Sequence, residues 1–327
     1  MASVLPSRPP VADVLLIAVA AVWGASFLAA KDLSAQTGVP AAIALRFLVA
    51  AAALGLLCLL RRERLPRGRG LTIAALLGGS QAAVIGLETW GVHLTSATNA
   101  GLLISLALVA TPVLESLVSH DRLPGRFFVV AVAAVAGVAL LVSDGGFRAP
   151  TAGDLLVLAA AVVRAVHVTA SGHLTRGRSD GSPGVVLVQM AVCAVVFSGV
   201  GAAGLPSAVA GLGAAGWADV LFLGLLCSVF AFVVQLWAVR RTSATRASVL
   251  MGTEPVWALL VGVVLAGEAI GPVALCGAAV ILIASAVAQA IERRHRLGPV
   301  QEGPRAVCAQ AAPRMVRAAE ASDAANH

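Results

Sequence analysis

Six ionisable side chains lie inside long apolar stretches of the sequence, and they are the first candidates for chemistry. A charged group in the apolar interior of a membrane costs at least about 2.5–3.5 kcal/mol on insertion scales. Each such residue therefore needs a partner of opposite charge or a polar cavity, and we look for partners among them. The six are Arg46, Glu88, Glu115, Arg164, His167 and Glu254.

Arg164 and Glu254 are predicted to meet near the middle of a membrane. Arg164 is about 12 residues into a predicted helix over 152–172, and Glu254 is eight or nine residues into one over 245–266, counted from the opposite side. At about 1.5 Å per residue these depths are roughly 18 and 13 Å, which coincide in an apolar slab of about 30 Å. The planar guanidinium suits a carboxylate or a phosphate. The pair is either a substrate or coupling-ion site or a permanent buried ion pair.

His167 follows Arg164 by three residues and shares its helix face. It is either a proton relay or a hydrogen-bonded core residue. Glu115 lies near the predicted end of its helix, where a carboxylate can reach the membrane surface.

The sequence contains one long unit twice, and self-similarity of this kind decides the architecture. Residues 90–100 and 237–247 share the pattern W-x-V-x-x-T-S-A-T-x-A at an offset of 147 residues. Each copy runs into an apolar segment that a proline, Pro112 or Pro255, is expected to interrupt. Nearer the start of each half, the positions of residues 23 and 164 correspond at an offset of 141.

Arg46 and Glu88 lie at similar predicted depth on neighbouring helices. The repeat places Gln189 and Gln235 at the equivalent positions of the second half, so a charged pair in one half becomes an amide pair in the other. Because both members change together, we expect the two to be in contact. The pair is an outer gate, a substrate clamp or a structural ion pair.

The composition predicts the environment in which this unit folds. Hydrophobic residues make up 59% of the chain and charged residues 12%, against about 25% charged in a typical soluble domain, and the mean hydropathy is +0.93. A soluble protein of 327 residues with so apolar a composition could not cover its surface with polar groups. The five cysteines form no C-x-x-C pair, and neither a disulfide framework, a metal site nor a cofactor is predicted.

Ten apolar runs are each about the 20 residues that cross an apolar slab. The backbone must satisfy its own hydrogen bonds there, so we expect helices. Because each repeat has an odd number of helices, five, the second half is predicted to lie in the membrane with the opposite orientation to the first. This inverted arrangement is found in secondary transporters. The predicted fold class is an all-α membrane protein with ten transmembrane helices in two inverted five-helix repeats. The runs are 11–30, 40–60, 71–93, 97–119, 126–143, 152–172, 184–204, 217–239, 245–266 and 272–291.

The positive charges predict the orientation of these helices. With the N-terminus in the cytoplasm, cytoplasmic segments hold 19 Lys and Arg residues, whereas the outer loops hold only Lys31 and Arg148. Both termini are therefore predicted to be cytoplasmic. The predicted domains are a lead at 1–10, the repeats at 11–143 and 152–291, and a disordered tail at 297–327.

The order and spacing of several short motifs resemble those of the drug/metabolite transporter superfamily and, within it, the EamA-type transporters. The resemblance covers about residues 11–290. The matching motifs are Trp23-Gly24-Ala25-Ser26-Phe27, Leu45-Arg46-Phe47-Leu48, Thr95-Ser96-Ala97-Thr98-Asn99-Ala100, Glu254-Pro255-Val256 and Gly267-Glu268.

This resemblance implies a multi-pass carrier of the bacterial inner membrane for small metabolites, often an exporter of amino acids or toxic compounds. Two positions depart from the pattern, since Ala107-Leu108 stands where the second half has Glu254-Pro255, and Arg164 stands where a tryptophan is expected. The residues themselves predict a central cavity walled by Trp23, Arg164 and Glu254. A zwitterion such as an amino acid would satisfy both charges.

Other functions stay open at this point. A facilitative or exchange carrier for a drug, sugar or nucleobase fits the same architecture, and protons are a candidate coupling ion. An intramembrane enzyme is a remote alternative. Gly24-Ala25-Ser26 is similar to the G-x-S motif of intramembrane serine proteases, but Phe27 follows where such sites usually have a glycine. The expected partners are the lipid bilayer and a small-molecule substrate, without nucleic acid, as a monomer or a homodimer.

The charge distribution makes one direct prediction about topology. A reporter protein fused after Arg296 should be active only in the cytoplasm, and one inserted in the 204–216 loop only outside. Reversed activities would contradict the predicted orientation.

Overall fold

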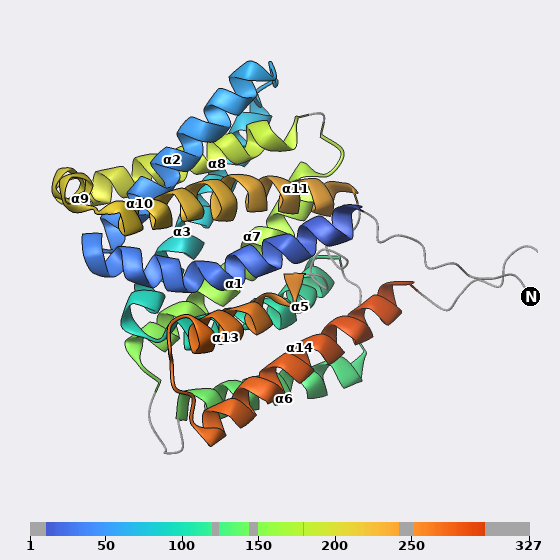
Figure 1. Ribbon diagram of the computed structural model, residues 1–327. Helices are drawn as coiled ribbons and strands as arrows, with labels where there is room; N and C mark the ends of the chain where they lie inside the picture. The colour runs from blue at the N-terminus through green and yellow to red at the C-terminus, as the bar shows by residue number, and fades with distance from the viewer. Residues whose placement is uncertain (1–10, 120–123, 144–149, 179, 242–250, 298–327) are drawn as a thin grey trace, which may run out of the picture. The chain divides into compact units, whose positions relative to one another are not determined.

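The computed structural model describes residues 11–119, 124–143, 150–178, 180–241 and 251–297, and within these ranges it contains helices and connections but no strand. The predicted N-terminal lead and nearly all of the predicted tail lie outside the described residues. Figure 1 shows the helices in order. They are α1 Val11–Thr37, α2 Val39–Leu60, α3 Arg69–Leu94, α4 Ala97–Leu103, the 3₁₀ turn η1 Ile104–Leu106, α5 Ala107–Ser119, α6 Gly125–Ser143, α7 Ala152–Thr175, α8 Ser182–Val200, α9 Leu205–Gly211, α10 Ala214–Leu221, the π-helix η2 Phe222–Phe230, α11 Ala231–Arg241, α13 Glu254–Val264 and α14 Pro272–Leu297.

Seven helical segments are long and apolar enough to cross a membrane, and three shorter apolar helices accompany them. The described part of the chain is thus helical, and the number of apolar helices indicates a multi-pass membrane protein. Each predicted apolar run corresponds to one of these segments, although the first part of 245–266 lies outside the described residues. The short helix α9 was not predicted, because its seven residues lie in a loop rich in Gly, Ala and Pro.

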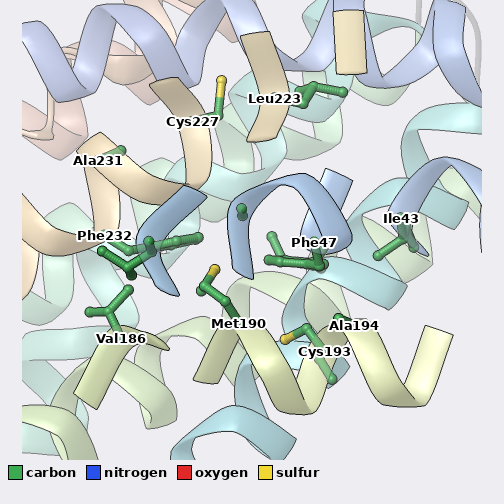
Figure 2. Close-up of a cluster of buried hydrophobic side chains, with 14 of the residues drawn as sticks. Ile43, Phe47, Val186, Met190, Cys193, Ala194, Leu223, Cys227, Ala231 and Phe232 are labelled. Carbon is green, nitrogen blue, oxygen red and sulfur yellow. The ribbon is translucent and has the colours of Figure 1, made fainter. Parts of the chain in front are cut away.

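A large apolar core holds the first-half helix α2 against two helices of the second half. Figure 2 shows Phe47 of α2 between Met190 and Cys193 of α8 on one side and the π-helix residues Leu223 and Cys227 on the other. Phe47 and Met190 are fully buried. Bulky side chains fill the space between α2, α8 and η2, so these three helices are held together by packing.

One end of the helices, the Lys31 end, gathers polar contacts from both halves. The Lys31 ammonium lies 3.8 Å from Glu268, and the Ser34 hydroxyl lies 3.1 Å from Nδ1 of His93. The Thr95 hydroxyl donates to Asp154 at 2.8 Å, and Asp154 also forms a capping box with Thr151 at the start of α7. All of these residues belong to segments that the sequence places on one side of the membrane.

The opposite end, the Arg240 end, gathers the segments predicted to face the other side. Arg240 at the end of α11 donates to the Thr175 hydroxyl at 3.3 Å and to the carbonyl oxygen of Asp180 at 2.6 Å. Arg178 pairs with Asp180 at 2.9 Å. Glu63, from the connection between α2 and α3, lies against Gly181. The contacts therefore sort the connections into the two sets that the sequence predicts.

These contacts also fix the direction of each helix. The C-terminal end of α1 and the N-terminal end of α7 both lie at the Lys31 end, so α1 and α7 run in opposite directions. The start of α2 meets the end of α8, where Gly201 packs on the backbone of Pro40. Helix α3 ends at the Lys31 end, whereas α11 ends at the Arg240 end.

Glu268 joins three segments at the Lys31 end. Its carboxylate accepts hydrogen bonds from the backbone N–H groups of Ala97 and Thr98, both at 2.9 Å, at the start of α4. A carboxylate is stabilised there because the first N–H groups of a helix have no partner within it. Burial by itself would raise the pKa of Glu268, but hydrogen bonds from Thr98 and Ala97 and the charge of Lys31 outweigh it and lower this pKa.

The Glu268→Gln variant should therefore be less stable by about 0.5–2 kcal/mol, the usual range for losing a helix cap. Because the folded-state pKa is lowered, the contribution of Glu268 is complete above the ordinary carboxylate pKa and is lost as the pH falls through the folded value. We expect the Tm of the detergent-solubilised wild type to exceed that of the variant at pH 7, and the difference to shrink in acid. Asp32→Asn is the control, since Asp32 is exposed at the same end. Equal Tm values for wild type and Glu268→Gln at pH 7 would contradict the capping role.

Candidate functional site

A polar cavity lies between helices of both halves, about midway between the two ends. In this conformation its side chains leave a space of about 20 Å³, roughly the room of one water molecule, so a metabolite would enter only after the helices part. Four charged residues line it, although it lies among apolar helices. Its lining residues are Trp23, Ser26, Arg46, Gln81, Val84, Ile85, Glu88, Arg164, His167, Val168, Phe232, Gln235 and Glu254.

Arg164 and Glu254 form a two-point ion pair in this cavity. Nη1 of Arg164 donates to Oε1 of Glu254 at 3.1 Å, and Nη2 donates to Oε2 at 2.9 Å. Such parallel hydrogen bonds between charged groups are roughly twice as strong as neutral ones and fix the geometry. The structure thus brings together the two residues that the sequence placed at the same depth.

Trp23 holds this ion pair from the side of α1. The guanidinium of Arg164 lies over the indole ring, 4.7 Å from its centroid, and a cation over a tryptophan face gains about 0.5–2 kcal/mol. The indole N–H donates to the carbonyl oxygen of Cys227 at 3.0 Å. The ring is therefore fixed at its edge by η2, with its face available to Arg164.

The backbone turns immediately before Glu254, within the segment that Pro255 is expected to interrupt. Residues 252–253 form a turn, and α13 begins at Glu254 with Pro255 in its first turn, where a missing N–H costs nothing. Pro112 lies inside α5, which continues through it, and the chain narrows to a 3₁₀ turn earlier, at η1. One proline removes a single backbone hydrogen bond, and packing against neighbours allows a membrane helix to continue.

His167 is buried among hydroxyl groups. Its Nδ1 lies 2.7 Å from the Ser80 hydroxyl and its Nε2 lies 3.4 Å from the Ser171 hydroxyl. Both ring nitrogens have partners, an arrangement typical of a hydrogen-bonded core residue. Its position on the cavity wall, beside Arg164, is the one that the sequence predicts.

Arg46 and Glu88 face the same cavity but do not form the direct pair that the sequence led us to expect. Their charged atoms are more than 4.0 Å apart. Nε of Arg46 instead donates to the Ser228 hydroxyl at 2.8 Å. Ser228 in turn donates to the carbonyl oxygen of Leu223, five residues earlier, the spacing of a π-helix. The wider turn of η2 places this hydroxyl beside Arg46, and residue depth alone could not indicate it.

The amide pair lines a second pocket next to the first. Gln189 and Gln235 lie there with Ser171, Val186, Leu236 and Val239, and the two pockets share His167, Val168, Phe232 and Gln235. The amide of Gln235 also lies 3.6 Å from Sδ of Met251. The structure thus brings all four members of the two predicted pairs to adjoining walls.

Comparisons with known proteins agree with this architecture. The model of the EamA-like transporter family matches residues 10–143 and again residues 151–288. A probable terminal-alkyne amino-acid exporter of Streptantibioticus cattleyicolor is 31% identical over 269 residues, which are 81% of this chain and 88% of that protein. An uncharacterized transporter of Archaeoglobus fulgidus is 27% identical over 278 residues, 84% of each chain. A solved crystal structure is similar at a TM-score of 0.63 and 20% identity, covering 85% of this chain and 97% of that one, which supports the fold alone.

The position of Glu254 depends on a close helix crossing at Gly24. A Cβ atom at Gly24 would lie 2.5 Å from Cβ of Trp257 and 2.9 Å from the carbonyl oxygen of Glu254. The Gly24→Ala variant should therefore lose about 1–3 kcal/mol of stability through overpacking, measured as a lower Tm in detergent. Gly79→Ala is the matched control, since nothing lies within 4 Å of the added methyl group there. Equal Tm values for the two variants would show that α1 and α13 do not depend on this approach.

Proposed function

The chain belongs to the EamA-like transporter family, and from that membership we propose that it is a secondary transporter of the bacterial inner membrane. In this proposal it exports a small metabolite by alternating access, with a zwitterion such as an amino acid as the first candidate. The observation that carries the proposal is the Arg164–Glu254 pair inside the cavity.

The proposed architecture is ten membrane spans in two inverted halves. Two observations support it: the family model matches the chain twice, and α1 and α2 run opposite to α7 and α8. Helix contacts also come in matching sets, because α1 packs on α13 as α7 packs on α5, and α2 packs on η2 as α8 packs on α3. In such a plan the substrate site lies near the membrane centre, between the halves. The charge bias supports cytoplasmic termini.

The chemistry of the pair suits a ligand that carries both charges. Arg164 would take the carboxylate of a zwitterion, and Glu254 would take its ammonium group, so that two ion pairs replace one. A ligand with a single charge would leave the other member of the pair buried without a partner, which typically costs about 3–5 kcal/mol. When the site is empty the two residues neutralise each other, so the helices can rearrange without a bare charge.

One relative supports the direction and the class of substrate. The Streptantibioticus cattleyicolor protein is a probable terminal-alkyne amino-acid exporter, and an exporter of a small metabolite fits the charged residues that line the cavity of this chain. A facilitative or exchange carrier for a drug, sugar or nucleobase is the alternative, and it would not require two opposite charges at the centre.

The Arg164→Gln variant should lose transport while staying folded. Without Arg164 the substrate carboxylate would be buried without a partner, at a cost of about 3–5 kcal/mol, so we expect uptake of radiolabelled amino acids into proteoliposomes to fall at least 100-fold. Size-exclusion profiles and Tm values check folding. Arg178→Gln removes a peripheral ion pair at the Arg240 end and serves as the control for loss of an arginine.

The Glu254→Gln variant tests the partner of Arg164. The charged groups that share the cavity with Glu254 are Arg46, Glu88 and Arg164, and His167 is beside them. Removing the Glu254 carboxylate should change the pH dependence of transport. If Arg164→Gln and Glu254→Gln both transport at wild-type rate and with the wild-type pH profile, the substrate site lies elsewhere.

A further inference from the structure

The two charged residues of the cavity that do not pair with each other point to a second subsite. We propose that Arg46 and Glu88 form a loading subsite that captures a zwitterion before the Arg164–Glu254 pair opens, Arg46 binding the carboxylate and Glu88 the ammonium group. This inference rests on the proposed function and adds an order of events to it.

Arg46 has hydrogen-bonding capacity that the described residues do not use. Its side chain is buried, with 4% of the residue exposed, and Nε donates to Ser228. The donors on Nη1 and Nη2 reach no acceptor among the residues that the structure describes. A buried guanidinium left with most of its donors unused is costly. Because Arg46 lines the cavity, a ligand bound there could accept hydrogen bonds from these donors.

Glu88 is the matching acceptor from another helix. It extends from α3 into the same cavity. Across the described part of the chain, its carboxylate accepts no hydrogen bond and has no cation within 4.0 Å. An acidic side chain within a membrane helix is expected to have a partner or to mark a functional site. Because the charged atoms of Arg46 and Glu88 are more than 4.0 Å apart, the two residues form no mutual ion pair.

The contrast with the central pair sets the order of events. Arg164 and Glu254 satisfy each other through two hydrogen bonds, so a ligand must break that pair before it binds there. A ligand that binds Arg46 and Glu88 makes new contacts without breaking any. Arg46 and Glu88 are therefore ready to bind a ligand once the cavity admits it, whereas Arg164 and Glu254 must first separate.

The charges of the cavity favour a ligand that is neutral overall. Arg46 and Arg164 balance Glu88 and Glu254, so a zwitterion preserves neutrality where a single ion would not. The adjoining pocket has the neutral Gln189 and Gln235 in place of charges, together with Val186, Leu236 and Val239. If this pocket widens when the helices part, its neutral lining suits an uncharged side chain of the ligand. The substrate class is therefore a zwitterionic amino acid with a neutral side chain.

Three probes that share the leucine side chain test the two charges of the ligand one at a time. Leucine carries both, leucinamide lacks the carboxylate, and N-acetylleucine lacks the ammonium group. Binding to detergent-solubilised protein, measured by calorimetry or thermal shift, should favour leucine over either derivative at least 10-fold in the wild type. Arg46→Gln should abolish the preference for leucine over leucinamide, and Glu88→Gln the preference over N-acetylleucine.

The Arg164→Gln variant separates loading from transport. It should still bind leucine with the wild-type preferences, although it does not transport it. Arg46→Lys, which keeps the charge, is the second variant if Arg46→Gln does not fold, and it should retain the preference for leucine over leucinamide.

The outcomes distinguish this inference from the proposed function. If the wild type binds neither leucine nor any other amino acid, the proposed substrate class is wrong and the loading subsite fails with it. If the wild type binds leucine but Arg46→Gln and Glu88→Gln keep its preferences, or if Arg164→Gln loses these preferences, there is no separate loading subsite and the proposed function stands without it.

Discussion

The cost of burying charge in an apolar membrane is the constraint on which this site depends. Arg164 on α7 offsets this cost by pairing with Glu254 on α13. These two helices lie near opposite ends of the second half of the sequence. Trp23 from the first half covers the guanidinium, and η2 holds that indole through the carbonyl oxygen of Cys227. One ion pair thereby connects α1, α7, η2 and α13, and a ligand that exchanges with it would act on all four.

Polar contacts at the two ends connect these helices to one another. At the Lys31 end a single carboxylate, Glu268, joins α1, the start of α4 and the connection after α13. At the Arg240 end Arg240 joins α11 to the connection between α7 and α8. Such polar contacts can form and break at lower cost than a packed core, so rearrangement for alternating access would begin at the ends. The core around Phe47 would move as a unit.

The sequence was most informative where the depth of a residue in the membrane decided which residues meet. Counting residues from predicted helix ends placed Arg164 and Glu254 at one depth, and the structure joins them. The same count placed Arg46 beside Glu88, yet these two do not touch, because depth does not give the direction of a side chain around its helix. The π-helix that offers Ser228 to Arg46 has no sequence pattern that separates it from an α-helix. Pro112 was misplaced for another reason, since packing against neighbouring helices lets a membrane helix continue through one proline.

The central claim is that the Arg164–Glu254 pair opens around a zwitterion during transport. A structure of the protein with a bound amino acid, trapped in an occluded state, tests it most directly. The account predicts that the substrate carboxylate lies on Arg164 and its ammonium group on Glu254, with the two side chains no longer hydrogen-bonded to each other. An occluded amino acid beside an intact Arg164–Glu254 pair would contradict it.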